Sequence, residues 1–162
     1  MTNRAGFTMI ELLIVMAIAA ILATVAVPSF WTLIQNQRAT TQANNLVTAV
    51  NLARSEAARR GDQVEICAST DQADCNSSDW TNGWVVRDAS SGEVLRVWDP
   101  LPTTGNINSN GDDEILFNSR GEADGNYSFT LWFNGCTGEQ TRSIQINRAG
   151  RASVTRNGTE CD

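Results

Sequence analysis

The ionisable side chains of this 162-residue chain exclude the commonest enzyme and metal chemistry. The sequence contains no histidine, so a histidine general base, a histidine-based triad and a zinc site with histidine ligands are impossible. Aspartate and glutamate are abundant, but they fall in turn-like segments, and no lysine or histidine base completes a hydrolytic site. We therefore expect a protein that is not an enzyme and binds no cofactor.

One acidic segment has part of the spacing of a calcium loop. Residues 106–111 read Asn-Ile-Asn-Ser-Asn-Gly, which follows the start of that motif, and three acidic residues come directly afterwards. The pattern fails at its first position, a neutral Asn106, and at its twelfth, where Phe117 replaces the bidentate glutamate. We interpret the segment as a solvated acidic turn and predict no metal site.

Positive charge gathers near the C-terminus, where it could contact nucleic acid. The segment holds Arg142, Arg148, Arg151 and Arg156, and a few arginines can bind phosphates with a strong dependence on salt. Residues 61–139, however, carry fourteen acidic side chains against three arginines, and the whole chain has a net charge of −6. DNA binding through Arg148, Arg151 and Arg156 is therefore an alternative that the charge of the surrounding chain opposes.

The most apolar part of the chain runs from Phe7 to Val27 and contains a single charge, Glu11. At about 1.5 Å per residue, a helix of this length nearly spans a hydrocarbon core of roughly 30 Å. A carboxylate inside a membrane is costly, so we expect Glu11 to be functional and to have a partner. A cleaved secretory signal is the alternative, but Glu11 fits it badly and the helical pattern continues beyond the run.

Beyond this run, small and apolar residues recur at intervals of three and four, which places them on one helix face. They are Ala39, Ala43, Leu46, Val50, Ala53 and Ala57. We predict that this face docks onto a globular head, while Arg38, Arg54 and Arg59 point largely elsewhere. Arg59 and Arg60 followed by Gly61 suit a helix C-terminus, so the helix should end near residue 60.

After Gly61 the pattern changes to short β-prone runs separated by turn residues such as Ser91-Gly92 and Asn110-Gly111. The runs are residues 63–69, 83–88, 93–99, 114–119, 127–133, 142–147 and 151–155. They predict an antiparallel β head of two packed sheets. With the long N-terminal helix, this makes an α+β fold. We divide the chain into a short polar leader (residues 1–6), the apolar, membrane-spanning half of the helix (7–29), its amphipathic half (30–60) and the β head (61–162).

The head holds four tryptophans and four cysteines that bear on its packing. We interpret Trp80, Trp84, Trp98 and Trp132 as core or inter-sheet packing rather than as carbohydrate-binding residues. The cysteines are Cys67, Cys75, Cys136 and Cys161, and an even number in an exported domain indicates disulfides with three possible pairings. We favour Cys67 with Cys75 and Cys136 with Cys161; zinc is the alternative, but no Cys-x-x-Cys spacing exists.

The string GFTMIELLIVMAIAAILATVAVP, from Gly6 to Pro28, resembles the class III signal of type IV pilins and type II secretion pseudopilins. The resemblance implies that a prepilin peptidase cuts after Gly6 and N-methylates Phe7. It also implies that Glu11, the fifth residue of the mature chain, pairs with the N-terminal ammonium of a neighbouring subunit. Pro28 falls where pilins commonly carry a proline that kinks or locally melts the helix.

Residues 54–154 resemble the GspH/FimT domain of minor pilins and H-type pseudopilins. The matching strings are RSEAARRGDQVEIC, CNSSDWTNGWVVRD, EVLRVWD, ILFNSRGEADG and INRAGRASV. DNA-receptor members of the FimT type have a Gly-Arg-x-Arg stretch near the C-terminus. The corresponding residues here are Gly150-Arg151-Ala152-Ser153, which lack the second arginine.

Together, these resemblances imply a minor type IV pilin of the priming or tip complex, which starts pilus assembly and supports twitching motility and adhesion. Its partners would be other minor pilins, the major pilin, the prepilin peptidase and the inner membrane. The precursor would cross that membrane once, with its head in the periplasm, before moving to the pilus tip. A DNA-binding pilin for transformation and the H-type pseudopilin of a type II secretion system are the alternatives.

Overall fold

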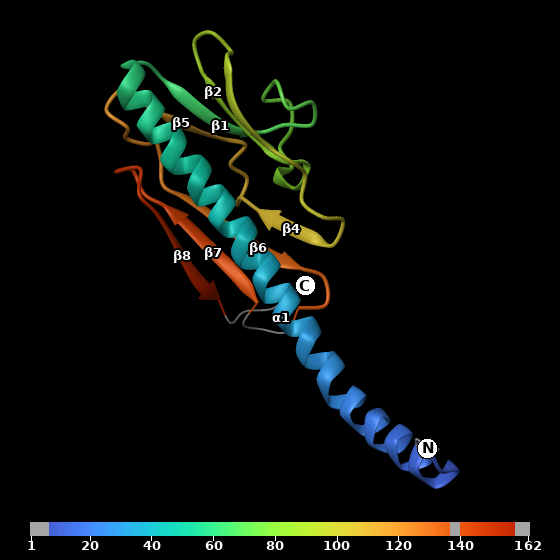
Figure 1. Ribbon diagram of the computed structural model, residues 1–162. Coiled ribbons are helices and arrows are strands. Elements are labelled where there is room, and N and C mark those ends of the chain that lie inside the picture. Colours follow the sequence, from blue (N-terminus) through green and yellow to red (C-terminus); the bar gives the residue numbers. More distant parts are fainter. Residues whose placement is uncertain (1–6, 137–139, 158–162) are drawn as a thin grey trace, which may run out of the picture. The chain divides into compact units, whose positions relative to one another are not determined.

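The computed structural model describes residues 7–136 and 140–157, and it divides into two compact units between Ile34 and Gln35. One long helix, α1 (Met9–Arg60), contributes residues to both units. The described strands all follow α1 and belong to the second unit. The predicted order, a long helix followed by an antiparallel β head, is confirmed (Figure 1).

In the first unit, the large apolar side chains that the structure describes are exposed to solvent, by between 40% and 83%. They include Phe7, Met9, Ile10, Leu12, Leu13, Ile14, Phe30, Trp31, Leu33 and Ile34. By length and composition, α1 is long and apolar enough to cross a membrane. Its backbone stays helical across Pro28, so the local melting that was one of two effects predicted for this proline is not seen.

In the second unit, α1 buries the predicted face against the sheets. Ala39, Ala43, Leu46, Val50, Ala53 and Ala57 have no exposed surface, and Ala49 joins them. Arg38, Arg54 and Arg59 are exposed, as predicted. The helix ends at Arg60, and Gly61 follows with a φ of 71°, which suits the left-handed helix stop predicted there.

Two antiparallel four-stranded sheets follow α1 in the second unit (Figure 1). The first has the order β3-β2-β1-β5. Its strands are β1 (Val64–Ala68), β2 (Trp84–Asp88), β3 (Val94–Trp98) and β5 (Glu114–Phe117). The second has the order β4-β6-β7-β8. Its strands are β4 (Gly105–Asn108), β6 (Tyr127–Phe133), β7 (Thr141–Ile146) and β8 (Ala152–Asn157).

The helix face and the inner faces of both sheets form one hydrophobic core. Trp80, on a short 3-10 helix (Trp80–Asn82), packs edge-on against Phe129 with the ring centres 4.9 Å apart. Trp84 stacks on Trp98 at 6.3 Å. The packing role predicted for these three tryptophans is confirmed.

The packing predicted for Trp132 is wrong in one respect, because the ring lies on the other side of the sheet. Burial alternates strictly along β6: Tyr127, Phe129, Leu131 and Phe133 are buried, and the residues between them are partly exposed. Trp132 is one of these intervening residues. Since side chains alternate across a strand, the ring faces away from the core.

Strand β4 was not predicted, and it corrects the interpretation of residues 106–111 as a turn. Asn106 and Asn108 pair with β6, opposite Trp132 and Thr130. The turn begins only at Ser109, whose carbonyl accepts a hydrogen bond of 3.1 Å from the Asp112 N–H. Left-handed backbone at Asn110 (φ 53°) and Gly111 (φ 93°) closes it. The segment that resembled the start of a calcium loop is therefore largely a strand.

One of the two predicted disulfides lies within the described residues. Cys67, in β1, is bonded to Cys75, and their Cα atoms are 5.4 Å apart. The bond closes the loop that follows β1, as predicted. The second predicted pair joins Cys136 to Cys161, and Cys161 lies outside the described residues, so that pairing stays a prediction.

Candidate functional site

The start of α1 presents the residues predicted to act in processing and assembly. The Thr8 hydroxyl accepts a hydrogen bond of 3.3 Å from the Glu11 N–H, which caps the first turn of the helix. Phe7 is 76% exposed and the Glu11 side chain is exposed as well. The predicted cleavage residue, Gly6, lies outside the described residues. The structure therefore presents Glu11 at the start of a helix whose described apolar side chains are exposed in the first unit.

Exposed apolar surface on this scale implies a second component that covers it. Burial of apolar area is worth roughly 25 cal/mol per Å², so a helix of this kind is stable in lipid or against other apolar helices and not in water. A membrane and a bundle of like helices both meet this requirement. This segment of α1 is thus a candidate site for both insertion and assembly.

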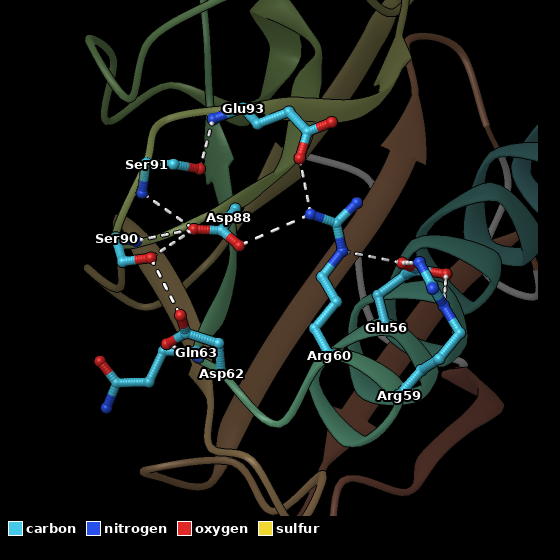
Figure 2. Close-up of polar contacts among 9 residues, drawn as sticks. All are labelled: Glu56, Arg59, Arg60, Asp62, Gln63, Asp88, Ser90, Ser91 and Glu93. Atoms are coloured by element: carbon cyan, nitrogen blue, oxygen red, sulfur yellow. Dashed lines mark hydrogen bonds and ion pairs between the residues drawn. The ribbon is translucent and has the colours of Figure 1, made fainter.

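A network of ion pairs joins the last turn of α1 to the turn between β2 and β3 (Figure 2). The Arg60 guanidinium lies 3.1 Å from Glu56, 2.6 Å from Glu93 and 3.6 Å from Asp88. Arg59 also pairs with Glu56, at 2.5 Å. Because Arg60 reaches both its own helix and the β2–β3 turn, the network fixes where α1 ends relative to the first sheet.

Asp88 is the buried member of this network. Its carboxylate accepts hydrogen bonds from the Ser90 hydroxyl at 2.6 Å, the Ser90 N–H at 3.1 Å and the Ser91 N–H at 2.8 Å (Figure 2). These donors hold the pKa of Asp88 far below its ordinary value of 3.8, with the Ser90 hydroxyl as the largest cause. Asp88, predicted only to end a strand, therefore also organises the turn after it.

Two glycines that are far apart in the sequence lie close together beside Arg54 of α1. Gly121 and Gly150 both have positive φ, of 74° and 71°. A Cβ on Gly150 would lie 2.5 Å from the Gly121 carbonyl oxygen and 3.0 Å from Cδ of Arg54. A Cβ on Gly121 would lie 3.0 Å from Cγ of Arg54. The strings NSRGEADG and NRAGRASV thus supply two turns that fit closely against the helix, a role that the sequence did not reveal.

Arg142 is buried under α1, although it belongs to the basic C-terminal segment. Its guanidinium donates to the Asn36 amide oxygen and, at 3.1 Å, to the Thr40 hydroxyl. Burial lowers its pKa, and the nearby Arg156 lowers it further. Arg142 therefore anchors β7 to the helix and does not belong to a solvent-facing basic surface.

The three arginines predicted as possible DNA contacts are exposed, and two of them, Arg151 and Arg156, lie on opposite sides of the sheet. Arg156 lies opposite Arg142 in the β7–β8 pairing, which puts its side chain on the helix side of the sheet. Arg151 lines a hollow of about 510 Å³ together with Gln145 and Ser153, on the other side. Arg148 lies in the turn between β7 and β8. Arg156 therefore does not share a face with Arg151, and DNA contact by the three arginines stays a prediction.

Comparison with known protein families identifies the family of this chain. A family model described as "Type II transport protein GspH" matches residues 42–150, about two thirds of the chain. The chain belongs to this family. A second model, the prokaryotic N-terminal methylation motif, matches residues 1–27 and covers Gly6, Phe7 and Glu11. The GspH-family head and the methylation motif confirm the resemblance that the sequence suggested.

Solved structures show the same fold at low sequence identity. The minor pilin FimU of Pseudomonas aeruginosa matches with a TM-score of 0.61 and 23% identity, over 74% of this chain and 90% of that one. The minor pseudopilin EpsH of Vibrio cholerae matches with a TM-score of 0.54 and 12% identity, over 74% and 97%. No curated protein sequence matches the chain.

The GspH family and its fold establish a structural role for the chain. The chain is a GspH-family protein, and it shares its fold with a minor pilin and with a minor pseudopilin. The methylation motif and the exposed apolar helix fit a membrane-anchored pilin. The features that sequence reasoning missed, at Arg54, Asp88 and Arg142, all position the helix on the head.

Proposed function

We propose that this GspH-family chain is a minor type IV pilin that joins other minor pilins in the complex that primes pilus assembly and stays at the tip. One observation carries the proposal. The chain combines a helical segment before Gln35, whose described apolar side chains are exposed and whose single charge after Phe7 is Glu11, with a folded head that buries its own core. That combination needs partners at the helix and leaves the head available for other contacts.

The proposed mechanism starts in the inner membrane, where the apolar part of α1 anchors the precursor and the head lies in the periplasm. A prepilin peptidase removes the leader after Gly6 and methylates Phe7. During assembly, the helix exchanges lipid for the helices of neighbouring subunits. Glu11 pairs with the N-terminal ammonium of the next subunit, which offsets the cost of a charge in an apolar environment and sets the stagger between subunits.

At the tip, the head supports adhesion and the filament supports twitching motility. We propose a structural role rather than a catalytic one. The likeness to FimU supports a pilus over a secretion machine, because both the TM-score and the identity are higher for FimU than for EpsH.

The test is a count of surface pili on a strain of the native host that lacks this gene and in which retraction is blocked. Blocking retraction separates failed assembly from rapid withdrawal. We expect pili to be lost or greatly reduced, and expression of the wild-type chain to restore them. An unchanged number of pili would refute the priming role.

The GspH match also favours a second candidate, the H-type pseudopilin of a type II secretion system. In that case, the deletion strain would keep its pili and would retain secreted enzymes inside the cell. Measuring exoprotein activity in culture medium and in cell extracts from the same strain therefore discriminates between the two candidates.

A DNA-binding pilin is the third candidate, and it depends on Arg148, Arg151 and Arg156. Gel-shift titration of duplex DNA with the full chain in detergent tests it, at several salt concentrations because phosphate contacts weaken with salt. The triple alanine variant should abolish any shift. The control replaces Arg96 and Arg120, exposed arginines elsewhere on the head, with alanine.

A further inference from the structure

The outer face of the sheet β4-β6-β7-β8 is polar but carries no charge on its strands. The strand residues that point away from the core and are not buried are Asn106, Asn108, Ser128, Thr130, Trp132, Ser143, Gln145, Ser153 and Thr155. All are amides or hydroxyls except the single indole. In a chain with eighteen acidic and twelve basic side chains, such a surface is unusual and offers hydrogen bonds without ion pairing.

Trp132 presents carbon rather than its N–H on this face. The residue is partly exposed, yet its Nε1 atom is buried and has no hydrogen-bond partner among residues 7–136 and 140–157. The exposed part of the indole is therefore ring carbon, which suits stacking against an apolar surface of matching size. The other tryptophans of the head, Trp80, Trp84 and Trp98, are buried in the core.

A depression of about 660 Å³ lies beside Trp132, bounded by β4, by the segment around the short 3-10 helix and by the turn after β4. Its lining combines the indole with amides, hydroxyls and carboxylates, among them Ser78, Asp79, Asn106, Asn108 and Asp113. The volume lies within the range of about 300–1,000 Å³ that is usual for small-molecule sites. Asp79 already accepts hydrogen bonds from the Thr81 N–H at 2.9 Å and from the Thr81 hydroxyl at 2.6 Å. Asp113 is exposed and can accept hydrogen bonds from ligand hydroxyl groups, and both carboxylates repel phosphates and sulfates.

We propose that this depression binds an uncharged oligosaccharide, with one sugar ring stacked on Trp132. A sugar ring has an apolar C–H face that suits an aromatic platform and a rim of hydroxyls that suits amides and carboxylates. A nucleic acid would meet Asp79 and Asp113 without a compensating cation among the residues that line the depression. This activity is independent of the proposed assembly role, which depends on α1.

The test uses the full chain in lauryldimethylamine oxide, a detergent without a sugar head group that could compete. Chitotriose is the probe, and binding is followed by saturation-transfer NMR. We expect Trp132→Thr to weaken binding by about tenfold or more and Trp132→Phe to keep it within about threefold, because phenylalanine retains an aromatic face. Thr155→Ala, on the same face but at the far edge strand, should bind like the wild type.

A second measurement keeps the test valid if Trp132→Thr does not fold. In protein labelled with ¹⁵N at tryptophan, chitotriose should shift the indole signal of Trp132, assigned from Trp132→Phe, and leave the other indole signals unchanged. The proposal is overturned if the wild type does not bind chitotriose, if Trp132→Thr binds normally, or if another indole signal responds instead. Displacement of chitotriose by duplex DNA would also overturn it, because the site would then favour a charged ligand.

Discussion

At the scale of single residues, two glycines, Gly121 and Gly150, approach each other and Arg54 of α1 closely. Gly150 packs against the Gly121 carbonyl and the Arg54 side chain, and its φ is positive. Any side chain at this position would have to displace a backbone carbonyl or the helix. These glycines matter for how the head holds the helix, whatever the head binds.

We predict that Gly150→Ala destabilises the head more than Gly92→Ala does. Both glycines have positive φ, which costs an L-residue about 1–2 kcal/mol, but Gly92 has open space where its Cβ would lie. The clash at Gly150 should add about 1–3 kcal/mol. Urea unfolding of the full chain in detergent measures the difference, and equal stability of the two variants would show that the close approach at Gly150 is unimportant.

The lowered pKa of Asp88 should make the stability of the head depend on pH. Its folded-state pKa lies below the ordinary value of 3.8, so its contribution is present above pH 3.8 and is lost as the pH falls further. Asp88→Asn should therefore lower stability at pH 7, and the gap to the wild type should narrow below pH 4. Thermal unfolding at several pH values measures this.

The matched control is Glu93→Gln, which changes a carboxylate that pairs with the same Arg60 but is exposed. Exposed ion pairs contribute little, so this variant should lose less stability than Asp88→Asn at pH 7. A gap between Asp88→Asn and the wild type that stays constant down to pH 2 would contradict the account of Asp88.

At the scale of elements, the second half of α1 depends on a narrow face of small residues. Leu46 is the largest side chain of this face and is fully buried. Leu46→Ala should lower the free energy of unfolding by about 2–5 kcal/mol because it leaves a cavity between the helix and the sheets. Thr48→Ala, on the exposed side of the same turn, should change it by less than about 0.5 kcal/mol. Similar losses for both would mean that the face is not the docking surface.

The same helix shows how far sequence reasoning reaches. Regular spacing from Ala39 to Ala57 identified the buried face, since a helix repeats its environment every three to four residues. The alternation in β6 was equally readable, because Tyr127, Phe129, Leu131 and Phe133 make one face apolar and leave Ser128, Thr130 and Trp132 on the other. Trp132 was assigned to the core from its residue type, and its place in this alternation was overlooked.

Strand β4 illustrates a different limit. Of its four residues only Ile107 is apolar and buried, and Asn106 and Asn108 have low strand propensity. Pairing with β6 provides the hydrogen bonds, and that partner lies more than twenty residues away in the chain. The contacts of Arg142 with Asn36 and of Gly150 with Gly121 are equally non-local. Such contacts depend on the assembled fold and leave no periodic signal.

At the scale of the whole molecule, the exposed apolar side chains at the start of α1 need contact with other subunits or with lipid. The head buries its own core, whereas the apolar side chains of the first unit remain exposed. A lone carboxylate among them, Glu11, is costly unless a positive charge is supplied from outside. This combination supports the proposal that the chain moves between a membrane and an assembly of like helices.

The most direct test is to measure how much of this protein is present in sheared surface filaments, for the wild type and for Glu11→Ala. The account predicts that the variant is inserted in the membrane and processed normally but is strongly depleted from the filaments. The control Glu93→Gln, which changes a carboxylate of the head, should be incorporated like the wild type. Normal incorporation of Glu11→Ala would contradict the claim that this carboxylate drives assembly.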